Sequence, residues 1–390
     1  MNRTALLFAV LLAGCASPPE RPQADIQDLL AARRADDALR ELERRALIER
    51  FVDYIASKAE AAAKDSRPPP TIDILVISGG GDWGAFGAGV LKGWGRVSGE
   101  LARPLFDVVT GVSTGALIAP FAFLGDDASI ERIVHFYRNP PEDVAKSRGW
   151  LFFLPDNPSL FVVPGLERDL RATFDRAMLE SIVAQGASGR GLIVNTTNVD
   201  LGDNRPWDLV AEAKAALAGD SERLRGILLA SAGIPALFPA RNLGEHLYVD
   251  GAITGNILYG GEAREDRNLI ARWQARHPRR PMPRLRYWVI FNNQVRFPPE
   301  VIENRWPAIM ARTTVMSTQT STVNSIRHLF AIAEIARLRQ RAEVEVRLMA
   351  VPDDFVPAKP GSFVPEVMND LVDLGERLGA DPASWRTTPP

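Results

Sequence analysis

Cysteine and histidine are the scarcest reactive residues in this sequence, with one cysteine, Cys15, and four histidines in 390 residues. A disulfide framework and a Cys/His zinc cluster both need more such residues, so neither is expected. A charge excess of one sign is also missing, because 46 Lys and Arg face 48 Asp and Glu. We therefore expect no metal ion and no nucleic acid as partners, since nucleic-acid binding usually needs a basic surface.

A short apolar run, residues 5–12, stands near the start of the chain and is too short to cross a bilayer. It has the layout of a secretory signal. Residues 12–15, Leu-Ala-Gly-Cys, resemble the bacterial lipobox, in which a peptidase cuts before the cysteine and its sulfur carries a diacylglyceryl group. The alternative is a plain signal peptide with an incidental cysteine. We expect residues 1–14 to be a lipoprotein signal peptide and Cys15 to be the lipidation site.

Lipidation of Cys15 would fix the protein to a membrane surface, because two or three acyl chains anchor a protein stably. Ala16 follows the cysteine, and the resemblance to bacterial lipoproteins implies the outer membrane here, because an aspartate at this position would imply retention at the inner one. The expected location is therefore the bacterial cell envelope, at the outer membrane and facing the periplasm.

Residues 23–67 contain neither proline nor glycine and are rich in charge, which predicts a long helix. Its apolar residues recur every three to four positions, so we expect it to dock on the main domain. Lying on a membrane is the less favoured alternative, because acidic and basic residues are mixed on its polar face. Pro68, Pro69 and Pro70 end the helix. The expected division is a signal peptide (1–14), a tether and N-terminal helical segment (15–70), a main domain (71–352) and a C-terminal extension (353–390) that frays over 381–390.

From residue 71 the pattern alternates between strands, glycine turns and helices. Two such units follow each other, and later apolar runs indicate further strands. This alternation predicts an α/β fold with a parallel or mixed sheet covered by helices on both faces. The predicted strands are 72–77, 105–110, 191–196, 285–292 and 344–351, and the first two helices are 85–94 and 116–124.

The second unit contains Gly111-Val112-Ser113-Thr114-Gly115, a G-x-S-x-G motif between a predicted strand and a predicted helix. In that context the motif forms a nucleophile elbow, with Gly111 and Gly115 present because a side chain there would clash. Ser113 would lie at a helix N-terminus, which favours negative charge. The alternative is a tight turn with a helix-capping serine.

The first unit ends in Gly79, Gly80 and Gly81, whose amides would lie at the same end of the sheet as Ser113. Such amides make an oxyanion hole for the charge that develops on an ester carbonyl. The same residues, with Gly84, match the dinucleotide-binding G-x-G-x-x-G pattern. That interpretation is disfavoured because it needs an acidic residue at the end of the next strand, whereas Asp107 comes too early.

A nucleophilic serine needs a base, and none of the four histidines stands in a turn typical of an active site. A better candidate is Asp250, which follows a short apolar strand and precedes Gly251 and Ala252. Alone, an Asp-Gly pair is most often a structural turn.

Together these motifs resemble those of the patatin-like phospholipases. The family pattern has a G-G-G-x-R/K-G turn, a G-x-S-x-G nucleophile, an A-S-x-A/G-x-P-x-x-F-P block and a D-G-G/A motif, in that order. They stand here at 79–84, 111–115, 230–239 and 250–252. One position departs, because Trp83 replaces the usual Arg or Lys, which puts in doubt a positive side chain beside the oxyanion hole.

The resemblance implies a three-layer α/β/α sandwich with a mostly parallel central sheet, and makes residues 71–352 the catalytic domain. It also implies a serine acylhydrolase of lipase or phospholipase A type that cleaves lipid carboxylic esters through a Ser113–Asp250 dyad. Neither a metal nor another cofactor is implied. Because a carboxylate with an ordinary pKa of about 4 is a weak base, burial is expected to raise the pKa of Asp250.

Two other functions stay open at this point: a hydrolytically silent, lipid-binding envelope lipoprotein, and a Ser-His-Asp esterase of α/β-hydrolase type. Two segments also allow more than one interpretation. The arginine-rich stretch 264–286 could lie on anionic lipid, or be solvated with Glu262, Glu265 and Asp266 as partners. The apolar run 150–155 could line an acyl pocket, form a lid or pack in the core.

Overall fold

The computed structural model describes residues 21, 24–149, 157–219, 221–260 and 268–390. The expected signal peptide (1–14), Cys15, the apolar run 150–155 and the start of the arginine-rich stretch lie outside these ranges. None of the helices within them combines the length with the apolar composition that spanning a bilayer requires.

The described chain is built on a mixed sheet whose strands follow the order β10-β9-β1-β2-β5-β8-β7, with β6 also paired to β5. The first five strands in this order are mutually parallel, whereas β6 and β8 run antiparallel to β5, and β7 antiparallel to β8. The predicted α/β class with a mostly parallel sheet is confirmed. The strands are β1 (Ile72–Ile77), β2 (Val108–Val112), β5 (Gly191–Asn198), β6 (Asp203–Asp208), β7 (Arg241–Leu243), β8 (His246–Asp250), β9 (Leu285–Gln294) and β10 (Val344–Val351), and a separate small hairpin joins β3 (Lys146–Ser147) to β4 (Phe161–Val162).

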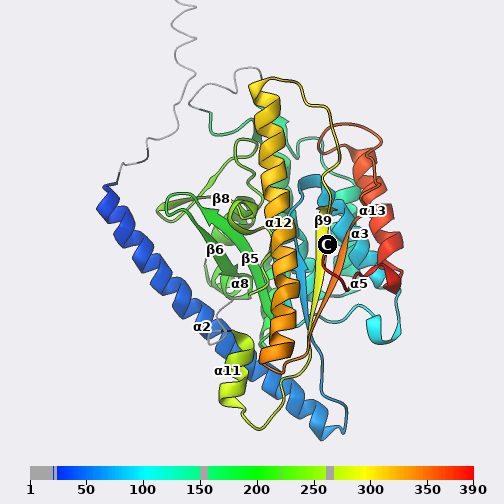
Figure 1. The fold of residues 1–390 in the computed structure, drawn as a ribbon. Coiled ribbons are helices and arrows are strands. Elements are labelled where there is room, and N and C mark those ends of the chain that lie inside the picture. Colours follow the sequence, from blue (N-terminus) through cyan, green and yellow to red (C-terminus); the bar gives the residue numbers. More distant parts are fainter. Residues whose placement is uncertain (1–20, 22–23, 150–156, 220, 261–267) are drawn as a thin grey trace, which may run out of the picture.

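Helices cover both faces of the sheet, as Figure 1 shows for α12 in front of it. The alternation of side chains along β1 explains why: Leu75 and Ile77 join one apolar core, and Ile74 and Val76 the other. The first core is formed with α3 (Gly84–Trp94), α4 (Thr114–Leu124), α5 (Asp127–Arg138), α6 (Pro164–Thr173), α7 (Arg176–Gly186), α8 (Leu209–Ala218), α9 (Glu222–Ser231) and α13 (Pro365–Gly379). The second is formed with α2 (Ile26–Lys64), α11 (Leu269–Arg276) and α12 (Trp306–Arg339), and the short α10 (Ala252–Gly255) follows β8.

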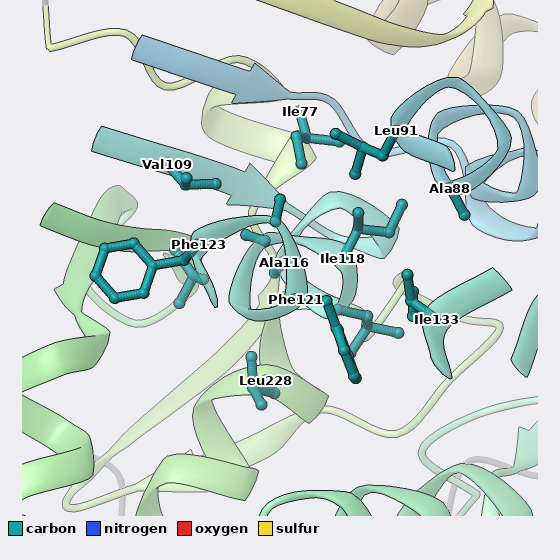
Figure 2. Close-up of a cluster of buried hydrophobic side chains, with 14 of the residues drawn as sticks. Ile77, Ala88, Leu91, Val109, Ala116, Ile118, Phe121, Phe123, Ile133 and Leu228 are labelled. Atoms are coloured by element: carbon teal, nitrogen blue, oxygen red, sulfur yellow. The ribbon is translucent and has the colours of Figure 1, made fainter. Parts of the chain in front are cut away.

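Helix α4, which follows the G-x-S-x-G motif, runs through the middle of the first core. Figure 2 shows Ala116, Ile118 and Phe121 of this helix among side chains from the sheet and the neighbouring helices. A helix enclosed on every side is expected to be apolar all round, and α4 carries no charged residue. The start of α4 is therefore held firmly against the end of β2.

The predicted N-terminal helix is present as α2, but only its second half docks as expected. Phe51, Val52 and Ile55 are buried against the sheet, whereas Leu39 and Leu42 are exposed. The first half is held by ion pairs instead, such as that between Arg40 of α2 and Asp203 of β6. The apolar periodicity therefore overstated the length of the docked face.

Three described arginines of the 264–286 stretch pair with acidic residues of α2, whereas Arg284 and Arg286 pair with acidic residues elsewhere. Arg272 and Arg276 both contact Glu49, and Arg280 contacts Glu60. The partners expected from the sequence, Glu262, Glu265 and Asp266, lie outside the described residues. These ion pairs join α11 and the loop after it to the long N-terminal helix.

The C-terminal residues 353–390 contribute to the first core. Helix α13 packs on α3, and the prediction that residues 381–390 fray is wrong. Trp385 is buried with its ring centroid 4.6 Å from that of Trp94 and 4.8 Å from that of Trp288. Arg386 also exchanges two backbone hydrogen bonds with Leu348 of β10. A single aromatic residue close to the terminus thus fixes a polar tail.

Candidate active site

Ser113 occupies a sharp turn between β2 and α4. Its backbone has φ 55° and ψ −125°, a strained conformation for a residue with a side chain and the one expected of a nucleophile elbow. Two residues later, Gly115 lies against the end of β1, where a Cβ atom would come within 2.4 Å of the Ile77 carbonyl oxygen. The turn can therefore form only with a glycine at position 115.

The backbone of Ser113 is held by Ser231, a fully buried residue at the end of α9. The Ser113 N–H group donates to Ser231 Oγ at 3.0 Å, and Ser231 Oγ donates to the Asn195 carbonyl oxygen at 2.7 Å. Ser231 belongs to the 230–239 block of the sequence, and no role was predicted for it there. The only indication in the sequence that Ser231 has a role was its position inside that block.

Asp250, the last residue of β8, faces Ser113 across the end of the sheet. Ser113 Oγ donates to Asp250 Oδ2 at 2.7 Å, and the Ala252 N–H group donates to Asp250 Oδ1 at 2.8 Å. The backbone of Asp250 is fixed too, because its N–H group donates to the Gly233 carbonyl and its own carbonyl accepts from the Thr197 hydroxyl. Both carboxylate oxygens are therefore oriented by donors.

The carboxyl group of Asp250 is buried, with the residue 2% exposed. Burial raises the pKa of Asp250 to about 7, although the hydrogen bonds from Ser113 and Ala252 act in the opposite direction. A group with a pKa near the working pH is a better general base than an ordinary aspartate. This carboxylate can thus accept a proton from a serine hydroxyl at neutral pH.

The glycine turn after β1 lies directly beside the serine, since a Cβ atom on Gly79 would be 2.8 Å from Ser113 Cβ. The N–H group of Gly79 already donates to Asn256 Oδ1 at 2.7 Å. Within the described part of the chain, no acceptor is assigned to the N–H groups of Gly80 and Gly81. These two amides are the ones left to receive a developing oxyanion.

Asn256 was not singled out from the sequence, although it stands six positions after Asp250. Besides accepting from Gly79, it donates through Nδ2 to Thr322 Oγ1 of α12 at 3.0 Å. It therefore joins the glycine turn to the helix in front of the sheet.

The histidines lie elsewhere, and their partners do not include Ser113. His135 contacts Asn139, His246 lies 3.7 Å from Asp200, His277 stacks on Trp273, and His328 pairs with Tyr259. The geometry thus offers no histidine for a Ser-His-Asp triad. Among the described residues there is also no group of three or more His, Asp or Glu side chains placed to hold a metal ion.

Asp107, the acidic residue weighed for dinucleotide binding, lies at the opposite end of β2 from Ser113. It is buried before β2, where its Oδ2 accepts from the Asp73 N–H group at 2.7 Å and its Oδ1 pairs with Lys58 at 2.6 Å. A ribose beside the glycine turn could not reach it. The dinucleotide interpretation therefore fails on geometry.

An apolar pocket adjoins Ser113 and the glycine turn. Besides Ser113 the pocket contains two hydroxyl groups, from Thr114 and Tyr137, and these are hydrogen-bonded to each other. Most of the remaining lining is aliphatic or aromatic. It comes from α4, α5, α6, the C-terminal region and the loops before α6 and after α9: Leu117, Phe136, Val144, Val163, Leu166, Phe238, Phe363 and Met368. Trp83, which replaces the basic residue of the family pattern, packs edge-on against Phe355.

A family model described as patatin-like phospholipase matches residues 75–260. The matched segment, which is slightly less than half of the chain, is therefore similar to the patatin-like phospholipases. Members of the family are typically lipid hydrolases, and the matched segment contains the glycine turn, Ser113 and Asp250. Phe363 and Met368 of the pocket lie beyond it.

One solved structure that resembles the chain is the crystal structure of VipD from Legionella pneumophila, with a TM-score of 0.36 and 12% sequence identity. The match covers 78% of this chain and 65% of that one, so the chain spans about two thirds of its length. A search of curated proteins gave no match.

Proposed function

We propose that this protein is a lipid acyl hydrolase that cleaves carboxylic esters through Ser113 and Asp250. The observation that carries the proposal is the 2.7 Å hydrogen bond from Ser113 Oγ to a buried carboxylate beside an apolar pocket. A serine, a base within hydrogen-bond reach and backbone N–H donors close by are the parts that acyl transfer needs.

In the proposed mechanism, Asp250 takes the proton of Ser113 as Oγ attacks the ester carbonyl carbon. The negative charge that develops on the carbonyl oxygen is stabilised by the N–H groups of Gly80 and Gly81. As the carbon–oxygen bond of the ester breaks, the protonated Asp250 returns the proton to the leaving alcohol. A water molecule then gives a proton to Asp250 as it attacks the acyl carbon. When the bond between this carbon and Ser113 Oγ breaks and the fatty acid leaves, Asp250 returns that proton to Oγ and the Ser113 hydroxyl is regenerated.

The pocket supports an acyl chain, rather than a polar head group, as the part of the substrate bound beside Ser113. Its lining is mostly apolar, and burial of each methylene group contributes about 0.8 kcal/mol. The head group would then lie on the other side of the ester, toward solvent.

The proposal is tested with the full chain carrying Cys15→Ser, assayed on nitrophenyl butyrate and on phosphatidylcholine vesicles. Ser113→Ala and Asp250→Asn are each expected to lower turnover by about 10³-fold or more. The matched control is Ser129→Ala, because Ser129 is also buried but pairs with Asp126 on α5. A folded wild-type protein without Ser113-dependent turnover would instead favour the silent lipid-binding alternative.

We also propose that Cys15 carries the lipid anchor and holds the enzyme in the bacterial cell envelope, which the lipobox-like residues 12–15 support. Mass spectrometry of the mature N-terminus tests this. An unmodified thiol, or a different N-terminal residue, would refute it.

A further inference from the structure

Ser113 lies at the end of the sheet formed by the carboxyl ends of the parallel strands, which we call the Ser113 edge. The N-terminal end of α12 projects past this edge. Gln319 Nε2 donates at 2.7 Å to the carbonyl oxygen of Gln294, the last residue of β9, and Thr322 contacts Asn256 beside the glycine turn. Residues 319–322 are therefore level with this edge. Residues 306–318 continue beyond it for about 20 Å, at 1.5 Å per residue. Figure 1 shows this end of α12 at the top of the molecule.

The projecting part of α12 exposes large apolar side chains. Trp306 is 78% exposed and Met310 is 58% exposed, and Ile309 lies between them on the same face, because positions three and four apart adjoin on a helix. Met316, two helical turns after Ile309, extends this face toward the sheet, whereas the exposed Val315 lies on another side of the helix. We call residues 306–316 the apolar tip of α12. A water-exposed helix end would ordinarily be polar, and a contiguous apolar surface indicates an interaction site.

Charge at the apolar tip is neutralised locally. Arg312 is the one charged residue between positions 306 and 326. Its guanidinium group folds back onto the preceding loop, where it pairs with Glu300 at 2.8 Å and lies 4.0 Å from the Phe297 ring centroid. The arginine side chain is 17% exposed, so the tip presents little charge to a partner.

The hydroxyl groups of the tip are also satisfied within the helix. Thr313 donates to the Ile309 carbonyl and Thr314 to the Met310 carbonyl, each at 2.8 Å. A hydroxyl that is bonded one turn back can leave water at a lower desolvation cost. The threonines therefore add methyl surface to the tip without adding unpaired polar groups.

We propose that the apolar tip of α12 docks on a lipid surface. Trp306 belongs to the outermost turn, where an amphipathic indole ring suits the head-group level of a bilayer, and Ile309 and Met310 would reach the boundary of the acyl chains. Because the tip extends from the Ser113 edge, docking turns that edge toward the membrane. This inference rests on the proposed function, which requires a lipid ester to enter at the same edge.

The first experiment reports whether the tip enters the membrane. Cys15 is the only cysteine, so the full chain with Cys15→Ser accepts one new cysteine for a polarity-sensitive fluorophore. The label on Met310→Cys is expected to shift to the blue with phosphatidylcholine vesicles. The matched control is Leu338→Cys, because Leu338 is 63% exposed near the other end of α12 and should show no shift. Equal shifts at both positions, or none at Met310→Cys, would overturn the proposal.

The second experiment separates docking from catalysis. The triple variant Trp306→Ser, Ile309→Ser and Met310→Ser, in the Cys15→Ser chain, is expected to bind phosphatidylcholine vesicles about tenfold or more weakly, since burial of one large apolar side chain already corresponds to such a factor. Vesicle hydrolysis should fall with binding, while hydrolysis of soluble nitrophenyl butyrate stays unchanged. The control is the double variant Ile335→Ser and Leu338→Ser near the other end of α12, which should bind like the parent chain.

The outcomes distinguish the two proposals. Unchanged vesicle binding by the triple variant overturns docking and leaves catalysis standing. The same holds if sedimentation shows a dimer that the triple variant dissociates, because a second copy would then cover the tip. Absence of Ser113-dependent hydrolysis of the soluble ester overturns the proposed function, while vesicle binding still tests the tip.

Discussion

Replacing Asp250 with asparagine is expected to abolish activity and, at alkaline pH, to stabilise the fold. The pKa of the carboxyl group is raised by burial from 3.8 to about 7. A difference of about 3 pH units corresponds to about 4 kcal/mol that the folded state loses by holding this group ionised. Asparagine has nearly the same shape and no charge, so it can still accept from Ala252 and face Ser113.

The pKa of Asp250 is higher in the folded than in the unfolded state, and this sets the pH range over which Asp250→Asn changes stability. Below about pH 4 the carboxyl group is protonated in both the folded and the unfolded state, so Asp250→Asn should change the free energy of unfolding little. Between about pH 4 and pH 7 the wild type loses stability, because this carboxyl group ionises in the unfolded state and stays protonated in the folded one. Above about pH 7 the free energy of unfolding of Asp250→Asn exceeds that of the wild type by a constant amount of about 4 kcal/mol. Urea denaturation of both proteins at pH 5 and pH 8 measures it. A variant less stable than the wild type at pH 8, or the same difference at both pH values, would refute the reasoning.

Four further outcomes follow from the same structure. The kcat/KM for a soluble ester should fall as pH drops below about 7, because Asp250 must be ionised to act as the base, and a flat profile between pH 5 and pH 8 would contradict this. Ser231→Ala leaves two buried backbone groups without their partner, so it should cost about 1–3 kcal/mol in urea denaturation and lower kcat. Leu166→Trp narrows the pocket and should reduce the kcat/KM preference for octanoyl over butyryl esters by about tenfold or more. Trp385→Ala should destabilise by about 3–5 kcal/mol, whereas Trp306→Ala, at an exposed position, should change stability by about 0.5 kcal/mol or less.

Strands buried on both faces were the most predictable part of the fold. The bounds of β1 coincide with the run 72–77, because a strand covered on both faces is apolar at nearly every position. The bounds of β10 also coincide with the run 344–351, although this edge strand alternates apolar residues with Glu345 and Arg347 in its first half. Strand β2 was predicted at 105–110 and spans Val108–Val112. Its end was missed because it includes Gly111 of the elbow, and the low strand propensity of glycine assigns that residue to the turn.

Contacts between distant segments were the least predictable part. The partners of the arginines on α11 come from α2, more than 200 positions earlier, and sequence inspection offers only nearby acidic residues as candidates. The burial of Trp385 was not predicted for a similar reason. A tryptophan among polar and proline residues gives no periodic signal, and its aromatic neighbours come from the distant α3 and β9.

At the glycine turn, too, a contact with a distant residue could not be predicted from the sequence. Three consecutive glycines offer three equivalent N–H groups in the sequence, and only Asn256, which is 177 positions away, takes one of them out of use at Gly79. Asn256 and Asp250 belong to one short segment around α10, so that segment contacts the nucleophile through Asp250 and the glycine turn through Asn256. Residues 250–256 thus help to hold both the nucleophile and the glycine turn in place, and donors that are held in place stabilise charge without reorganising during the reaction.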